Sequence, residues 1–200
     1  MCWNAEVSMQ SFLAGSFAIV IAALFHLPFP FILFYATIVF MQLIEYLVWT
    51  YGSDPDINFY LSVSASFLLI LQPVASILTL PTGRMPVLFA YLMIGSLYHI
   101  LRDKSSLRKR YQMYPAENGH LRWNWMDNDP SSFIGYAVYF IFLLAPLFWK
   151  ADPAMIAVIL STLGLSLYTF SKSRTWGSMW CWLVNGIMII ACGHQIWNTI

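Results

Sequence analysis

Three side chains interrupt an apolar run near its end and would share one face of a helix. Gln42, Glu45 and Trp49 in "MQLIEYLVWT" follow i, i+3 and i+7 spacing. A charged group inside hydrocarbon costs about 2.5–3.5 kcal/mol on insertion scales, so it usually faces the protein interior and often marks a pathway. No lysine or arginine is available at the depth of Glu45. We interpret Glu45 as a protonatable or cation-binding carboxyl group. The alternative is a structural carboxyl, solvated near the interface or hydrogen-bonded to a neighbouring helix.

Further polar and aromatic residues are predicted at a similar depth in other apolar runs. Asn185 follows Trp182 in "WCWLVN", and His99 ends the fourth run. Amide side chains would supply hydrogen bonds and the tryptophans aromatic walls. Because aromatic faces with a carboxylate suit organic cations, we favour an amine-like solute. The candidate solute- or ion-binding residues are Glu45, Gln42, Trp49, Asn185, Trp182 and His99.

The elements that position these residues follow from an unusually apolar composition. Hydrophobic residues make up 60% of the chain and charged residues 10%, against roughly 25% charged in soluble domains. We predict an all-α polytopic membrane protein, one helical bundle over residues 1–200. Its seven transmembrane helices are predicted at about 10–26, 30–50, 58–80, 86–101, 132–149, 154–171 and 178–198. The first and fourth are shorter than the ~20 residues of an upright crossing, so a re-entrant segment is the alternative there.

Lysine and arginine placement predicts how the chain is threaded. With seven spans, eight of these residues fall on one side, mostly in the polar loop 102–131, and two on the other. The positive-inside rule then places the amino terminus in the cytosol and the carboxyl terminus outside or in a lumen. We expect the basic part of the loop to contact anionic lipid headgroups. Trp123 and Trp125 in this loop suit an interfacial aromatic belt.

Two weaker patterns concern symmetry and helix packing. A shift of 121 or 122 residues aligns several positions, Gln72 with His194 among them, which would give a 3+1+3 repeat of the kind that transporters use. Gln72 precedes a proline inside the third run, and such breaks often line cavities. Small residues, among them Gly15, Gly186 and Gly193, indicate close helix packing rather than chemistry.

Other chemistries find little support in the residues. Three cysteines give neither a disulfide framework nor a CxxC pair. His26 and His194, both near the outer face, fall short of a closed four-ligand metal site. We therefore expect no metal and no cofactor. A net charge of +1 without a recognition module argues against nucleic acid as a partner.

Three motifs resemble an uncharacterised family of small polytopic membrane proteins encountered in giant DNA viruses and protists. They are "MCWNAEVS" at the start, "MQLIEYLVW" and "GSMWCWLVN". The resemblance carries no known function. It implies that its signature positions form one site: residues 1–4, Gln42, Glu45, Trp49 and residues 180–185.

We expect a transporter or channel for a small solute or ion, with Glu45 in the cytosolic half of the bundle. The alternatives are an intramembrane enzyme acting on lipid, with His99, Glu45 and Cys181 in one cavity, and a receptor or membrane scaffold. A non-enzymatic role is favoured. The expected partners are membrane lipids and a small solute, proton or cation, and a homo-oligomer is left open.

Overall fold

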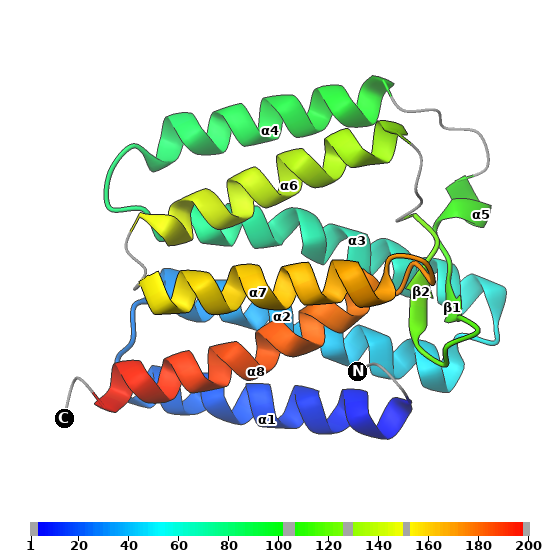
Figure 1. Ribbon diagram of the computed structural model, residues 1–200, viewed down its shortest axis with the longest axis horizontal. Helices are drawn as coiled ribbons and strands as arrows, with labels where there is room; N and C mark the ends of the chain where they lie inside the picture. Colours follow the sequence, from blue (N-terminus) through cyan, green and yellow to red (C-terminus); the bar gives the residue numbers. More distant parts are fainter. Residues whose placement is uncertain (1–3, 102–106, 126–129, 150–152, 198–200) are drawn as a thin grey trace.

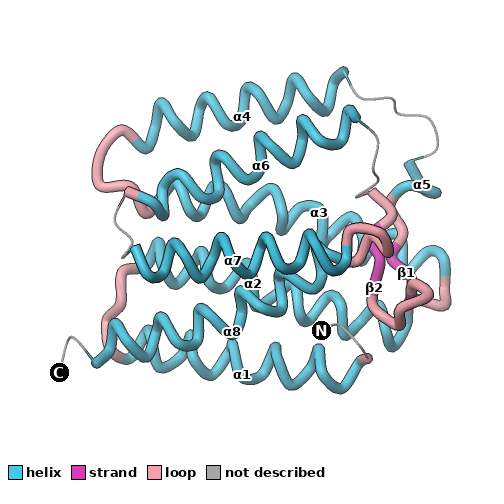
Figure 2. The backbone as a smooth tube through the Cα atoms, in the orientation of Figure 1, coloured by secondary structure: helices cyan, strands magenta, loops and turns pink. Residues whose placement is uncertain are grey.

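A computed structural model describes residues 4–101, 107–125, 130–149 and 153–197. These residues form eight helices and one antiparallel β-hairpin (Figures 1 and 2). The helices are α1 (Ala5–Leu24), α2 (Phe29–Tyr51), α3 (Pro55–Leu78), α4 (Arg84–Leu101), α5 (Leu107–Arg110), α6 (Pro130–Phe148), α7 (Pro153–Phe170) and α8 (Trp176–Trp197). The strands are β1 (Met113–Pro115) and β2 (Leu121–Trp123).

Each of the seven apolar runs is a helix, and all but one of the boundaries fall within three residues of the prediction. The exception is α1, which begins at Ala5 because Asn4 caps it: the Asn4 side chain accepts a hydrogen bond from the Val7 amide at 2.9 Å. With 20 residues, α1 is long enough to cross a bilayer. The shortness expected for the first run was therefore wrong.

The chain is a helical, multi-pass integral membrane protein. Four helices, α1, α2, α3 and α8, are long and apolar enough to span a membrane, while α4, α6 and α7 hold shorter apolar stretches. Large apolar side chains point outward on each of these seven helices. Examples in chain order are Phe17, Phe40, Phe67, Phe89, Phe133, Leu165 and Ile190. A soluble monomer rarely exposes so much apolar surface, which suits a lipid surround.

The longer helices pack as a bundle with α1 and α4 at opposite edges (Figure 1). Helix α2 is central and packs against α1, α3 and α8. Helix α6 packs against α3 and α4, and α7 covers α8. The hairpin lies at one end of the bundle, called the plug end because residues 107–125, called the plug below, cover it. At the opposite end lie the connections from α1 to α2 and from α3 to α4.

The polar loop folds back onto the bundle instead of lying free. Residues 107–125, which include α5, β1 and β2 and are called the plug, bury Met113, Leu121, Trp123 and Trp125 against α2, α3 and α8. Trp123 is 2% exposed and Trp125 7% exposed, so the interfacial-belt interpretation is wrong for both. Stacking of the two indoles, with centroids 5.7 Å apart, helps to hold them inside the protein.

Specific hydrogen bonds fasten the plug to α3 and to the beginning of α8. The buried Asn58 side chain of α3 donates to the Met113 carbonyl at 2.6 Å and accepts from the Met113 amide at 2.9 Å. Ser178 of α8 donates to the Leu121 carbonyl at 3.0 Å. Asn118 donates to Thr175, just before α8, at 3.0 Å. These bonds pair backbone groups of the hairpin at Met113 and Leu121, which lowers the cost of burying its apolar face.

Candidate functional site

Glu45 is completely buried, as the sequence led us to expect. It lies on α2, six residues or about 9 Å before the helix ends at Tyr51. Gln42, also fully buried, donates from Nε2 to Glu45 Oε2 at 3.4 Å. The long distance makes this a weak hydrogen bond. The thiol of Cys181 on α8 lies close enough to Glu45 for the two groups to interact electrostatically.

The plug covers the helix face that carries Glu45. Met41 and Val48 flank Glu45 on this face, and both belong to the apolar cluster that contains Trp123 and Met113 of the plug. The carboxyl group is therefore enclosed between α2, α8 and the plug. Water at the plug end can reach it only if this packing opens.

Asn185 belongs to the interface of α8 with α1. Its Nδ2 donates to the Ser11 carbonyl at 2.9 Å, and its side chain is 2% exposed. Gly15 makes this approach fit, because a Cβ added there would lie 2.8 Å from Asn185 Oδ1 and 2.6 Å from Val39 Cγ2. The predicted close packing is confirmed at Gly15. It is wrong at Gly186 and Gly193, where an added Cβ meets open space.

The remaining candidates are spread over the bundle. Trp49 is half-buried beside the apolar cluster under the plug, and its indole nitrogen has no hydrogen-bond partner among the described residues. Trp182 is half-buried on α8. His99 lies in the last turns of α4, a helix that packs against α3 and α6, and its side chain lies outside the described part. The signature positions Met1, Cys2 and Trp3 also lie outside the described residues.

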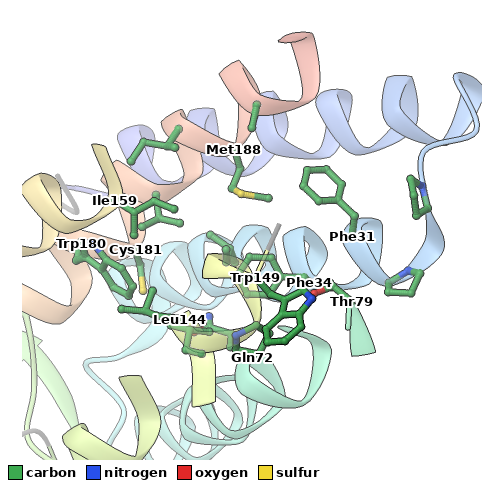
Figure 3. A pocket seen from close by; sticks show the side chains of 18 of the residues that line it. Phe31, Phe34, Gln72, Thr79, Leu144, Trp149, Ile159, Trp180, Cys181 and Met188 are labelled. Carbon is green, nitrogen blue, oxygen red and sulfur yellow. The ribbon is translucent and has the colours of Figure 1, made fainter. Parts of the chain in front are cut away.

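A cavity of about 420 Å³ occupies the half of the bundle away from the plug, between α2, α3, α6, α7 and α8 (Figure 3). We call it the chamber. Its mouth lies at the end opposite the plug, where Pro28, Pro81 and Trp149 are exposed. Its size falls within the range of small-molecule sites, and most of its lining is apolar. None of the five candidate residues whose side chains the structure describes lines it.

Aromatic packing between α6 and α8 closes the floor of the chamber. Phe140 contacts Trp176 and Trp180, with ring centroids 6.0 and 5.3 Å away. Beyond this contact both helices line the chamber, α6 through Leu143 and Leu144 and α8 through Val184 and Met188 (Figure 3). The two helices thus touch through their side chains at the floor and leave space between them toward the mouth.

Two prolines inside helices border the chamber. Pro146 lines it directly, and Pro73 follows the lining residue Gln72. Each proline removes a backbone hydrogen bond from its helix. Ser76 of α3 donates to the Leu143 carbonyl of α6 at 2.7 Å, and this hydrogen bond joins the two proline-containing helices. The expectation that the Gln72-Pro73 break lines a cavity is confirmed.

Cys181 connects the chamber to the buried carboxyl group. It lines the deep end of the chamber, beside Trp180 (Figure 3), and it also interacts with Glu45. On α2, Ile38 lines the chamber and Gln42 follows one helical turn later. One turn of helix therefore separates the chamber from the Gln42–Glu45 pair. Sequence reasoning singled out the pair but missed the chamber, because its space arises from how the helices diverge.

The two histidines considered as metal ligands, His26 and His194, have different surroundings. His26 has φ 55° and follows the last turn of α1, where its amide donates to the Ala23 carbonyl and the Leu27 amide donates to the Ala22 carbonyl. This is the Schellman end of a helix, usually made by glycine. His194 lines the chamber mouth. In the described ranges, no three histidine, cysteine, aspartate or glutamate side chains come together as a metal site would require.

Comparison with known proteins adds no relative: no protein-family model, curated protein or solved structure matches this chain.

Proposed function

We propose that this protein is a membrane transporter for a small solute, with the chamber as its solute entrance and Glu45 as the site of a coupled proton or cation. One observation carries the proposal: the chamber opens at one end of the bundle and stops one helical turn short of Gln42, which donates a hydrogen bond to the fully buried carboxyl group of Glu45. The plug closes the opposite end. A carrier that exposes its site to one side at a time needs this asymmetry.

The proposal assigns a movement to each closed layer. Phe140, Trp176 and Trp180 separate the chamber from the Glu45 region on one side, and the plug separates that region from the aqueous phase on the other. Passage requires the aromatic layer and the plug to open in turn. Hydrogen bonds from Asn58 and Ser178 to the Met113 and Leu121 backbone hold the plug in place, and such bonds can break and re-form as a part detaches and returns.

We further propose that all seven longer helices cross the bilayer, with the plug on the cytosolic side. The eight-to-two distribution of lysine and arginine supports this orientation. A membrane-impermeant thiol reagent applied from outside should then modify a cysteine added at the carboxyl terminus. It should spare a cysteine placed in the plug. The reverse labelling pattern would refute the orientation.

Proton movement in vesicles tests the role of Glu45. The purified protein is reconstituted with a pH-sensitive dye inside, and small organic cations and neutral amphiphiles are added in turn. At least one should drive proton movement, and Glu45→Gln should abolish it, because an amide neither binds nor releases a proton. Glu6→Gln is the matched control, since Glu6 is an exposed carboxylate in the first turn of α1.

Two results would contradict the transport proposal. One is wild-type protein that moves no protons with any added solute. The other is a folded Glu45→Gln variant with unchanged proton movement. The lipid-enzyme alternative receives less support, because His99 lies on α4, which packs against α3 and α6, whereas Glu45 and Cys181 interact across α2 and α8.

A further inference from the structure

The chamber contains few polar groups, and no charged side chain is among its described lining residues. Among the described lining residues there is no lysine, arginine, aspartate or glutamate; the polar ones are Gln72, Thr79, Cys181 and His194. A charged ligand head buried there would lack a counter-ion, and burying an unpaired charge is costly. An organic cation, which the sequence favoured, finds aromatic walls in the chamber but no carboxylate.

Two buried N–H groups in the chamber lack a hydrogen-bond acceptor. Gln72 is 2% exposed, and its Oε1 accepts from the Tyr139 hydroxyl, which leaves its Nε2 as a donor. Trp180 is 5% exposed, and its indole Nε1 is a donor only. Neither nitrogen has a partner among the described residues. Buried donors in native proteins are usually paired, so two orphaned donors lining one cavity indicate a missing acceptor.

Both donors belong to the same layer of the bundle. Tyr139, which holds Gln72, packs edge-on against Phe140 with centroids 5.0 Å apart, and Phe140 packs against Trp180 at 5.3 Å. This chain of contacts runs across the chamber floor from α3 through α6 to α8. An acceptor atom at the floor would lie in the layer of the two donors, while the apolar walls nearer the mouth would enclose the rest of the molecule.

We propose that the chamber binds a neutral molecule with an apolar body and a carbonyl-type oxygen, the oxygen directed at Gln72 Nε2 and Trp180 Nε1. This ligand class would be the solute of the proposed transporter, so its biological role rests on the proposed function. Binding is measured without flux, so the two can fail separately. The same chemistry is offered by a free ester, ketone or amide and by the acyl ester of a membrane lipid.

Native mass spectrometry of the detergent-purified protein tests the proposal with three probes of matched chain length. Methyl decanoate carries an acceptor oxygen, decylammonium carries a cation and undecane carries no polar group. Methyl decanoate should form a one-to-one complex and outcompete the other two. Equal or tighter binding of decylammonium or undecane would overturn the proposal.

Variants of the two donors supply the second arm. Trp180→Phe keeps an aromatic ring at the floor and Gln72→Met keeps the side-chain length, and each should weaken methyl decanoate binding roughly three- to tenfold, the range for one net hydrogen bond. Trp197→Phe is the matched control, because Trp197 is exposed at the end of α8 and is not among the described residues that line the chamber. If Gln72→Met fails to fold, Trp180→Phe still decides. Wild-type affinity in the folded donor variants would overturn the proposal.

The same spectra identify the natural source of the oxygen. A lipid that co-purifies with the wild-type protein, is displaced by methyl decanoate and is lost in Trp180→Phe points to a membrane lipid. Methyl decanoate binding without a co-purified lipid points to a free solute. Either result supports an acceptor-bearing apolar ligand.

Discussion

Replacement of Asn58 by alanine should release the plug while leaving the helical bundle intact. Asn58 holds β1 through two hydrogen bonds to the Met113 backbone, at 2.6 and 2.9 Å. Two further hydrogen bonds join it to the Gly52 carbonyl at 2.9 Å and the Ser62 hydroxyl at 3.1 Å. With alanine in place, a docked plug would bury an unpaired amide and an unpaired carbonyl at Met113, which is 1% exposed.

The size of the effect follows from these two backbone groups. Leaving a buried donor or acceptor unsatisfied costs about 1–3 kcal/mol. We take about 2–4 kcal/mol for the pair, because part of the loss is recovered by local relaxation. Each 1.4 kcal/mol changes an equilibrium tenfold. The fraction of molecules with the plug detached should therefore rise roughly 30- to 1,000-fold.

A cysteine at position 121 reports plug opening. Leu121 is fully buried on the docking face of β2, and the three native cysteines are first replaced by alanine. The rate at which Leu121→Cys reacts with a maleimide is proportional to the detached fraction when closing is fast. Asn124→Ala is the control, since among the described residues the Asn124 side chain bonds to Lys109 and Tyr114, which belong to the plug itself. An unchanged labelling rate in folded Asn58→Ala protein would refute this account of how the plug is held.

The remaining predictions concern packing, a helix end and pH. Gly15→Ala should lower thermal stability by about 1–3 kcal/mol, because its Cβ would overlap Val39. Gly186→Ala should be neutral or stabilising, because an added Cβ there meets open space. Equal effects of the two substitutions would contradict the packing described for Gly15. His26→Gly should raise stability by up to about 1 kcal/mol in the same assay, since the positive φ favours glycine; a clear loss would reveal another role. Burial lowers the pKa of His120, so the docked plug binds fewer protons than the detached plug. Docking should therefore be complete above pH 6.5 and weaken as the pH falls below that value. Detachment should appear as a red shift of tryptophan emission at low pH, and His120→Gln should remove the shift.

The helices could be predicted because their signals are local. Apolar runs of sufficient length set their number, and proline, glycine and aspartate residues between the runs set their ends. The burial of Glu45 and Gln42 also followed from local reasoning, since polar groups on an apolar helix avoid lipid. Only the start of α1 differs from its predicted position by more than three residues, because the side chain of Asn4 caps the helix.

The plug and the chamber depend on contacts between distant segments, which no local pattern encodes. Trp123 and Trp125 are of the residue type that forms an interfacial belt, and they lie inward because contacts such as that of Asn58 with Met113 hold the plug on the helices. The chamber exists because α6 and α8 meet at Phe140 and Trp180 and diverge beyond that point. Gln72 gave the one usable hint of the chamber, as a polar residue beside a helix-breaking proline.

The enclosure of Glu45 also has a consequence for the order of synthesis. Helix α2 ends at Tyr51, yet the cluster that surrounds Glu45 includes the plug and Trp176 and Cys181 of α8, which leave the ribosome much later. A growing chain therefore holds an uncovered carboxyl group in the bilayer, at about 2.5–3.5 kcal/mol if charged, until α8 inserts. Insertion of α8 removes this penalty, so assembly of the bundle around Glu45 waits for the synthesis of a helix more than 120 residues further along the chain.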